Sequence, residues 1–107
     1  MVKRIALLLA LGIATAPVVP ALGAGTVRNV KIGDNFFKPR TVNIRQGTRV
    51  KWTWMGMNPH NVTVSSGPSK FHSRTQTSGT YSHTFGQKGT WHLVCTIHGF
   101  TMTVKVS

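Results

Sequence analysis

The sequence predicts an all-β fold, namely a Greek-key β-sandwich of about seven or eight strands in one domain. After residue 24 there is no helical apolar period, and short segments of alternating apolar and polar residues are separated by turn residues. The clearest alternation covers residues 48–54, where Val50, Trp52 and Trp54 share one face. A chain of 107 residues has room for a single sandwich of this kind.

The first half of the chain supplies three of the expected strands. They cover residues 26–32, 41–45 and 48–54. Turn-forming residues at 33–35 and 46–47 separate them, because Gly, Asn and Asp favour turns. Phe36, Phe37 and Pro39 are expected to form an apolar plug ahead of the second strand.

The second half supplies the remaining strands. They are expected over residues 60–65, 80–85, 90–95 and 102–106. His60 shares its face with Val62 and Val64, so His60 is expected to point inward at the edge of the core. Residues 66–79, rich in Ser, Thr and Gly, form a long irregular stretch, and Cys95 closes the following strand on its inward face.

The N-terminus has the pattern of a secretory signal. Two basic residues precede an apolar run over residues 5–16, which is too short for a membrane span of about 20 residues. Residues 21–23 form a small-x-small cleavage site. We therefore expect a signal peptide at residues 1–24 and a single domain at residues 25–107. That domain is expected to be exported, as a monomer, to the periplasm or the extracellular space.

The charge of the chain is strongly one-sided. Thirteen Lys and Arg residues face a single acid, Asp34, and the net charge is +12. Such a field steers association with acidic partners. The basic residues are scattered rather than clustered, so no nucleic-acid arm is indicated, although binding to nucleic acid by charge alone stays open. The shortage of carboxylates also removes most acid–base mechanisms.

Cys95 is the only cysteine, so this small domain has no internal disulfide. Small exported domains usually gain stability from disulfides or from a metal. A free thiol in an oxidising compartment is also exposed to oxidation. Metal ligation by Cys95 would protect the thiol and stabilise the fold.

The region around Cys95 is rich in metal ligands. Residues 95–102 contain a thiolate, an imidazole and a thioether with the spacing Cys-x-x-His-x-x-x-Met. With a second imidazole, for which His60 is the candidate, this set suits copper. Zinc also binds one Cys and two His, but structural zinc sites usually have more thiolates, and copper lies above zinc in intrinsic affinity.

These motifs resemble the cupredoxins, and in particular the small plastocyanin-like proteins. The resemblance rests on Asn-Pro-His-Asn around His60 and on the motif at residues 95–102. Residues 46–52 and 89–95 also resemble strands of that family. It implies one type 1 copper ion held at the end of the sandwich.

The resemblance also implies a role for each matching residue. His60, Cys95 and His98 are the implied equatorial ligands, and Met102 is the implied axial ligand. Asn61 and Thr96, each next to a ligand, are expected to tie the two ligand loops together by hydrogen bonds. Met102 leads directly into the alternation of the last strand, so it is alternatively a core residue, with the axial position empty or lined by Phe100.

The favoured function is that of a soluble carrier of single electrons, with acidic redox partners docking near His98. An apolar patch is expected around that histidine, formed by Met55, Met57, Pro59, Gly99 and Phe100. The alternative is a protein that stores or delivers copper without redox turnover. An enzyme with Cys95 as nucleophile is not expected, because the pattern shows no acid that orients the base, although Asn61 could do so, and because an exported reactive thiol would oxidise. Three further histidines are not needed for the site, and a second weak copper site among them stays open; they are His72, His83 and His92.

Overall fold

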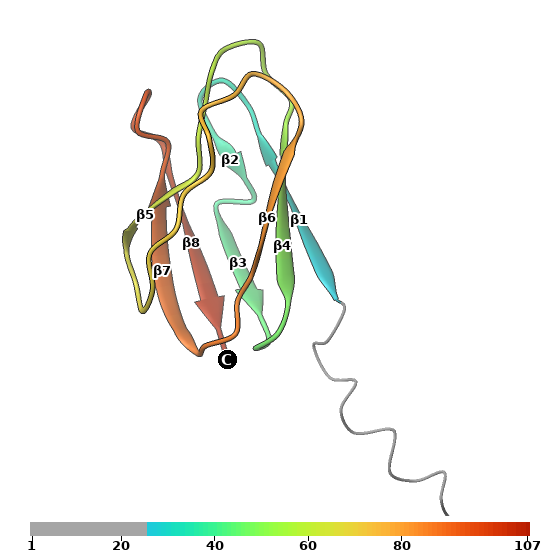
Figure 1. Ribbon diagram of the computed structural model, residues 1–107, viewed down its shortest axis with the longest axis vertical. Coiled ribbons are helices and arrows are strands. Elements are labelled where there is room, and N and C mark those ends of the chain that lie inside the picture. Colours follow the sequence, from blue (N-terminus) through green and yellow to red (C-terminus); the bar gives the residue numbers. More distant parts are fainter. Residues whose placement is uncertain (1–25) are drawn as a thin grey trace, which may run out of the picture.

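The computed structural model describes residues 26–107 as eight strands in two facing sheets of four strands each (Figure 1). The prediction of an all-β sandwich is thereby confirmed. The signal peptide expected at residues 1–24 lies outside the described residues. Among those described, no helix is long and apolar enough to cross a membrane.

The first sheet has the strand order β2-β1-β4-β6. Its strands are β1 (Val27–Ile32), β2 (Phe37–Lys38), β4 (Arg49–Trp54) and β6 (Thr80–Thr84). β1 runs parallel to β4, whereas β1 with β2 and β4 with β6 are antiparallel pairs.

The second sheet has the strand order β3-β8-β7-β5. Its strands are β3 (Thr41–Ile44), β5 (Thr63–Ser66), β7 (Gly89–Val94) and β8 (Thr101–Val106). β7 and β8 pair antiparallel, and this register places Leu93 opposite Met102 and Val94 opposite Thr101.

The inward faces of both sheets form one core, as the period-2 pattern predicted. Trp52 of β4 and Trp91 of β7 are its largest fully buried side chains. Val50 and Trp54 are buried beside Trp52, while the intervening Lys51 and Thr53 are only partly buried. Burial of apolar surface of this kind is the main stabilising contribution to a sandwich.

Two predicted elements differ from the structure. The strand expected from residue 60 begins only at Thr63, because His60 forms an isolated bridge with Gln76 and the buried Asn61 uses its side chain for hydrogen bonds. The apolar plug is also divided. Phe37 is buried in the short strand β2, whereas Phe36 is 46% exposed.

The β1–β2 and β4–β5 loops and the β5–β6 connection lie at the top of Figure 1, with the β7–β8 loop at the upper left, and the C-terminus lies at the opposite end. Side-chain contacts join these loops, because His60 lies against Asp34, Cys95, His98 and Phe100.

Candidate metal centre

The β7–β8 loop presents two of the predicted ligands. Cys95 follows the last residue of β7, and its backbone N–H donates to the carbonyl of Phe100 over 2.9 Å. The N–H of Gly99 donates to the carbonyl of Cys95 over 2.7 Å, and Gly99 has a φ of 82°, which favours glycine. This tight loop leaves Cys95 fully buried and turns His98 to the surface.

His60 lies in the segment between β4 and β5, which connects the two sheets, and it is fully buried. Its backbone forms a pair of 3.0 Å hydrogen bonds with Gln76, one in each direction. Its carbonyl also accepts a 3.0 Å hydrogen bond from the indole N–H of Trp54. These hydrogen bonds with Gln76 and Trp54 hold the His60 main chain in place independently of its imidazole ring.

The three side chains converge. Cys95 Sγ lies 3.7 Å from Nδ1 of His60 and 3.9 Å from Nδ1 of His98, and the two Nδ1 atoms are 3.0 Å apart. A trigonal ion with bonds of about 2.0 Å to nitrogen and about 2.3 Å to sulfur separates S and N by about 3.7 Å. The sulfur–nitrogen distances fit a shared metal ion. The two Nδ1 atoms, 3.0 Å apart, need to move apart only slightly for both to bind that ion.

No other cluster of this kind occurs within residues 26–107: His60, Cys95 and His98 form the single group of three or more His, Cys, Asp or Glu ligands. His72 and His92 lie elsewhere. Nδ1 of His72 is 2.9 Å from the carbonyl of Ser73, and Nδ1 of His92 is 3.4 Å from the Thr103 hydroxyl.

Asn61 and Thr96 tie the two ligand loops together, as expected. The side-chain amide of Asn61 donates to the Thr96 hydroxyl over 2.8 Å, and its carbonyl oxygen accepts from the Thr96 backbone N–H over 3.1 Å. The same amide donates to the Thr75 hydroxyl over 3.0 Å. Hydrogen bonds around ligands restrict their movement, so the spacing between His60 and Cys95 is held by this contact.

Asp34, which the sequence marked as a turn residue and as the single acid, contacts the site. Its Oδ1 lies 2.9 Å from Nε2 of His60 and accepts hydrogen bonds from the backbone amides of Met57 and Asn58 over 2.9 and 3.0 Å. The hydrogen bond with His60, followed by those from Asn58 and Met57, lowers the pKa of Asp34 to about 2. The carboxylate is therefore ionised at neutral pH.

Met102 is buried in β8, and its sulfur already has a partner. The indole N–H of Trp52 donates to Sδ of Met102 over 3.3 Å. The ring of Phe100 lies edge-on to the ring of His60, with the centroids 5.4 Å apart. The fold therefore gives Met102 a core position and places an aromatic ring beside the imidazole.

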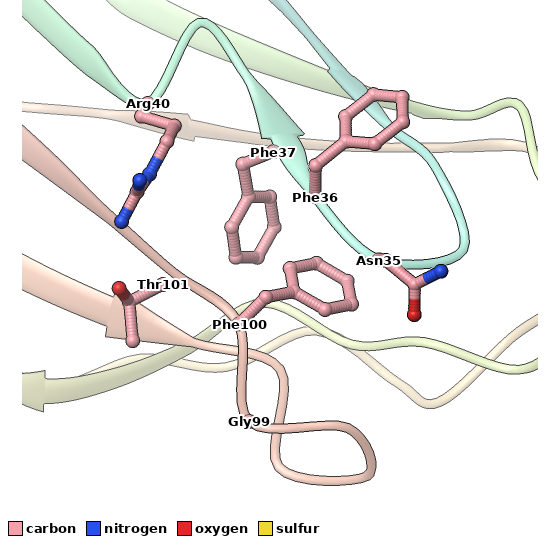
Figure 2. Close-up of a pocket in the computed structure, with 7 residues that line it drawn as sticks. All are labelled: Asn35, Phe36, Phe37, Arg40, Gly99, Phe100 and Thr101. Carbon is pink, nitrogen blue, oxygen red and sulfur yellow. The ribbon is translucent and has the colours of Figure 1, made fainter.

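Exposed apolar side chains occur in both loops that carry the ligand candidates. Met55 and Met57, 60% and 85% exposed, precede His60, and Ile97, 53% exposed, precedes His98. The β7–β8 loop also borders a surface pocket of about 360 Å³. Its lining residues are Asn35, Phe36, Phe37, Arg40, Gly99, Phe100 and Thr101. Figure 2 shows the rings of Phe37 and Phe100 next to each other; they pack edge to face, with their centroids 4.9 Å apart.

A sandwich with a thiolate and two imidazoles gathered at one end defines a copper protein of the cupredoxin class. Comparison with known proteins gives the family. Residues 24–107 match the family of copper binding proteins described as the plastocyanin/azurin family, and the chain belongs to this family. This family and the His60–Cys95–His98 cluster support a single type 1 copper ion as cofactor.

Individual relatives agree with this assignment. The chain is 32% identical to amicyanin-alpha of Methylorubrum extorquens over 109 aligned positions, covering 89% of this chain and 92% of that protein. A purple cupredoxin from Nitrosopumilus maritimus is 26% identical, with a TM-score of 0.66 over 74% of this chain and 98% of that one. Pseudoazurin from Hyphomicrobium denitrificans, 18% identical, shares the fold, with a TM-score of 0.68 over 77% of this chain and 76% of that one.

Proposed function

We propose that this protein is an exported carrier of single electrons, with one copper ion bound by His60, Cys95 and His98 and with Met102 as the axial residue. The observation that carries the proposal is the convergence of Cys95 Sγ with the Nδ1 atoms of both histidines, at 3.7 and 3.9 Å. A bound copper supplies the couple between Cu(I) and Cu(II). A thiolate with two imidazoles is the donor set of blue-copper electron-transfer sites.

The protein contributes a rigid and largely dry environment. His60 and Cys95 are fully buried, so water has little access to their ligand atoms. The Asn61–Thr96 hydrogen bonds hold the two loops at one spacing. Because ligands held in this way move little, the geometry changes little between oxidation states, which suits rapid electron transfer.

The exposed histidine is the proposed point of contact with redox partners. His98 alone among the three proposed ligands is exposed, and the two loops that carry the ligand candidates also expose Met55, Met57 and Ile97. The domain as a whole carries eleven Lys and Arg residues against Asp34. We therefore infer acidic partners that dock over His98, guided by the positive field. The signal pattern at residues 1–24 supports a periplasmic or extracellular location.

Copper storage or delivery is the second candidate. The observation that favours it is the pair of exposed thioethers, Met55 and Met57, close to the site. Thioethers are soft ligands that suit Cu(I). Under this alternative the same three ligands hold the ion, but rapid electron exchange is not needed.

A spectroscopic titration tests the proposal. Cu(II) added to the reduced domain of residues 25–107 should give an intense visible band from thiolate-to-copper charge transfer, at one equivalent. Ascorbate should bleach the band and ferricyanide should restore it over many cycles. NMR line broadening in mixtures of the two oxidation states should then reveal fast electron self-exchange. Colourless, weakly bound copper contradicts the proposal, and a coloured site with slow exchange favours storage or delivery.

A further inference from the structure

The single acid of the chain lies against a proposed copper ligand. Asp34 belongs to the β1–β2 loop, and its Oδ1 is 2.9 Å from Nε2 of the fully buried His60. The Asp34 side chain is 34% exposed. The domain holds eleven Lys and Arg residues, and within residues 26–107 the one salt bridge of this carboxylate is with the His60 imidazole.

The same oxygen also holds the β4–β5 loop. Oδ1 accepts from the N–H groups of Met57 and Asn58 over 2.9 and 3.0 Å. Gly56 makes this approach possible, because a Cβ at that position would collide with the Asp34 carboxylate. One atom thus joins the loop that precedes His60 to the His60 ring itself.

The contact decides which nitrogen of His60 is available to a metal. An ionised carboxylate can only accept hydrogen bonds, so Nε2 of His60 must carry the proton and donate it to Asp34. In the neutral ring, Nδ1 is then left with the lone pair. Nδ1 is also the atom that faces Cys95 Sγ and Nδ1 of His98. The tautomer selected by Asp34 is therefore the one that can bind the ion.

We propose that Asp34 is a positioning residue that selects the Nε2–H tautomer of His60 before copper arrives and, through its negative charge, favours Cu(II) over Cu(I) once copper is bound. A carboxylate behind a ligating imidazole makes that imidazole a stronger donor. Cu(II) has a higher positive charge than Cu(I), so the negative charge of Asp34 stabilises Cu(II) more. The tautomer is a property of the apo protein, whereas the effect on the oxidation state of copper rests on the proposed function.

Two substitutions separate these effects. Asp34→Asn keeps an oxygen able to accept from Nε2 and from both amides, but removes the charge. Asp34→Ala removes both. The control, Asp34→Asn combined with Asn35→Asp, keeps a carboxylate in the same loop and the same net charge, but not the contact.

The first measurement is ¹⁵N–¹H correlation NMR of the apo protein at pH 8. Wild type should show His60 as the pure Nε2–H tautomer, Asp34→Asn should largely keep it, and Asp34→Ala should give a mixture. A pure Nε2–H tautomer in Asp34→Ala overturns the positioning role. This result is independent of copper, so it stands even if the electron-transfer proposal fails.

The second measurement is the reduction potential of the copper-loaded variants. We expect Asp34→Asn to shift the relative affinity toward Cu(I) by tenfold or more, which is about 59 mV upward for a one-electron couple. The control double variant should shift in the same direction, because its carboxylate no longer reaches His60. If Asp34→Asn has the wild-type reduction potential, or if the control double variant returns to it, Asp34 does not favour Cu(II) through its contact with His60. Asp34→Asn retains the loop contacts, so the test holds even if Asp34→Ala does not fold.

Discussion

His60 and His83 are both inward-facing histidines of the same sandwich, but their surroundings are opposite in kind. His60 is fully buried among polar groups, with Asp34 on Nε2 and with Cys95 and His98 facing Nδ1. His83 of β6 is only partly buried and is stacked on Phe71, with ring centroids 3.7 Å apart and an interplanar angle of 12°.

This contrast shows how neighbours assign a role to the same side chain. Polar partners at both nitrogens orient the His60 ring and direct a lone pair, which is what a metal ligand requires. An aromatic face instead shields the His83 ring from water, and desolvation lowers the pKa of His83 below its usual value. The first environment supports binding chemistry, whereas the second supports packing.

Removing each imidazole in turn should show the largest difference between the two histidines. His60→Gly should abolish the visible copper band, because the trigonal ligand set is lost, and millimolar imidazole should restore it by filling the vacated position. His83→Gln should leave the band at full intensity. Absorption spectra during copper titration measure both. A retained band in His60→Gly would remove His60 from the ligand set.

Copper bound at the His60 side of the comparison should stabilise the whole domain. Binding to the native state alone adds about 4 kcal/mol at a thousandfold excess over Kd. The melting temperature of the domain should therefore rise on copper addition, and Cys95→Ser should remove the increase. Calorimetry of the apo and copper forms checks this, and equal melting temperatures in wild type would argue against a metal-dependent role.

Met102 is joined to the aromatic core on the side of His83, because its sulfur contacts Trp52 and Trp52 packs against Tyr81 with ring centroids 5.9 Å apart. If Met102 acts as a weak axial ligand, Met102→Leu should raise the reduction potential and Met102→Gln should lower it, with copper retained in both.

If Met102 is solely a core residue, the pair should behave differently. Met102→Leu should then leave the potential unchanged, since the swap conserves volume. Met102→Gln should cost about 1–3 kcal/mol by burying an amide. Voltammetry together with thermal melts of both variants separates the two roles, and an unchanged potential in Met102→Leu excludes axial ligation.

The smallest effect should come from the titration of His83. Its pKa is lowered in the folded state by desolvation, so the unfolded chain takes up the proton first as the pH falls. Its contribution to stability is fully present above the unfolded value of about 6.5 and decreases as the pH falls below it. In apo-protein melts between pH 8 and 5, His83→Gln should therefore lose less stability than wild type. Parallel curves would contradict this.

The sequence by itself determined the architecture and the identity of the ligand candidates. Alternation along residues 48–54 is local information, because neighbouring side chains in a strand point to opposite faces. The short spacing between Cys95 and His98 is likewise local, and it places both side chains in one tight loop. Resemblance to a family added the Asn61–Thr96 contact, which the structure confirms.

Only the tertiary structure decided which residues surround those ligands. Asp34 and His60 are 26 positions apart, and Trp52 and Met102 are 50 positions apart. Neither pair leaves a trace in local periodicity, because each forms only when loops and strands distant in sequence are packed together. The alternation that places Met102 inward cannot show where its sulfur points, and a turn-forming Asp34 gives no sign that its carboxylate faces an imidazole. The ligand candidates follow from short-range pattern and from the family resemblance, whereas their orientation and charge environment follow from long-range packing.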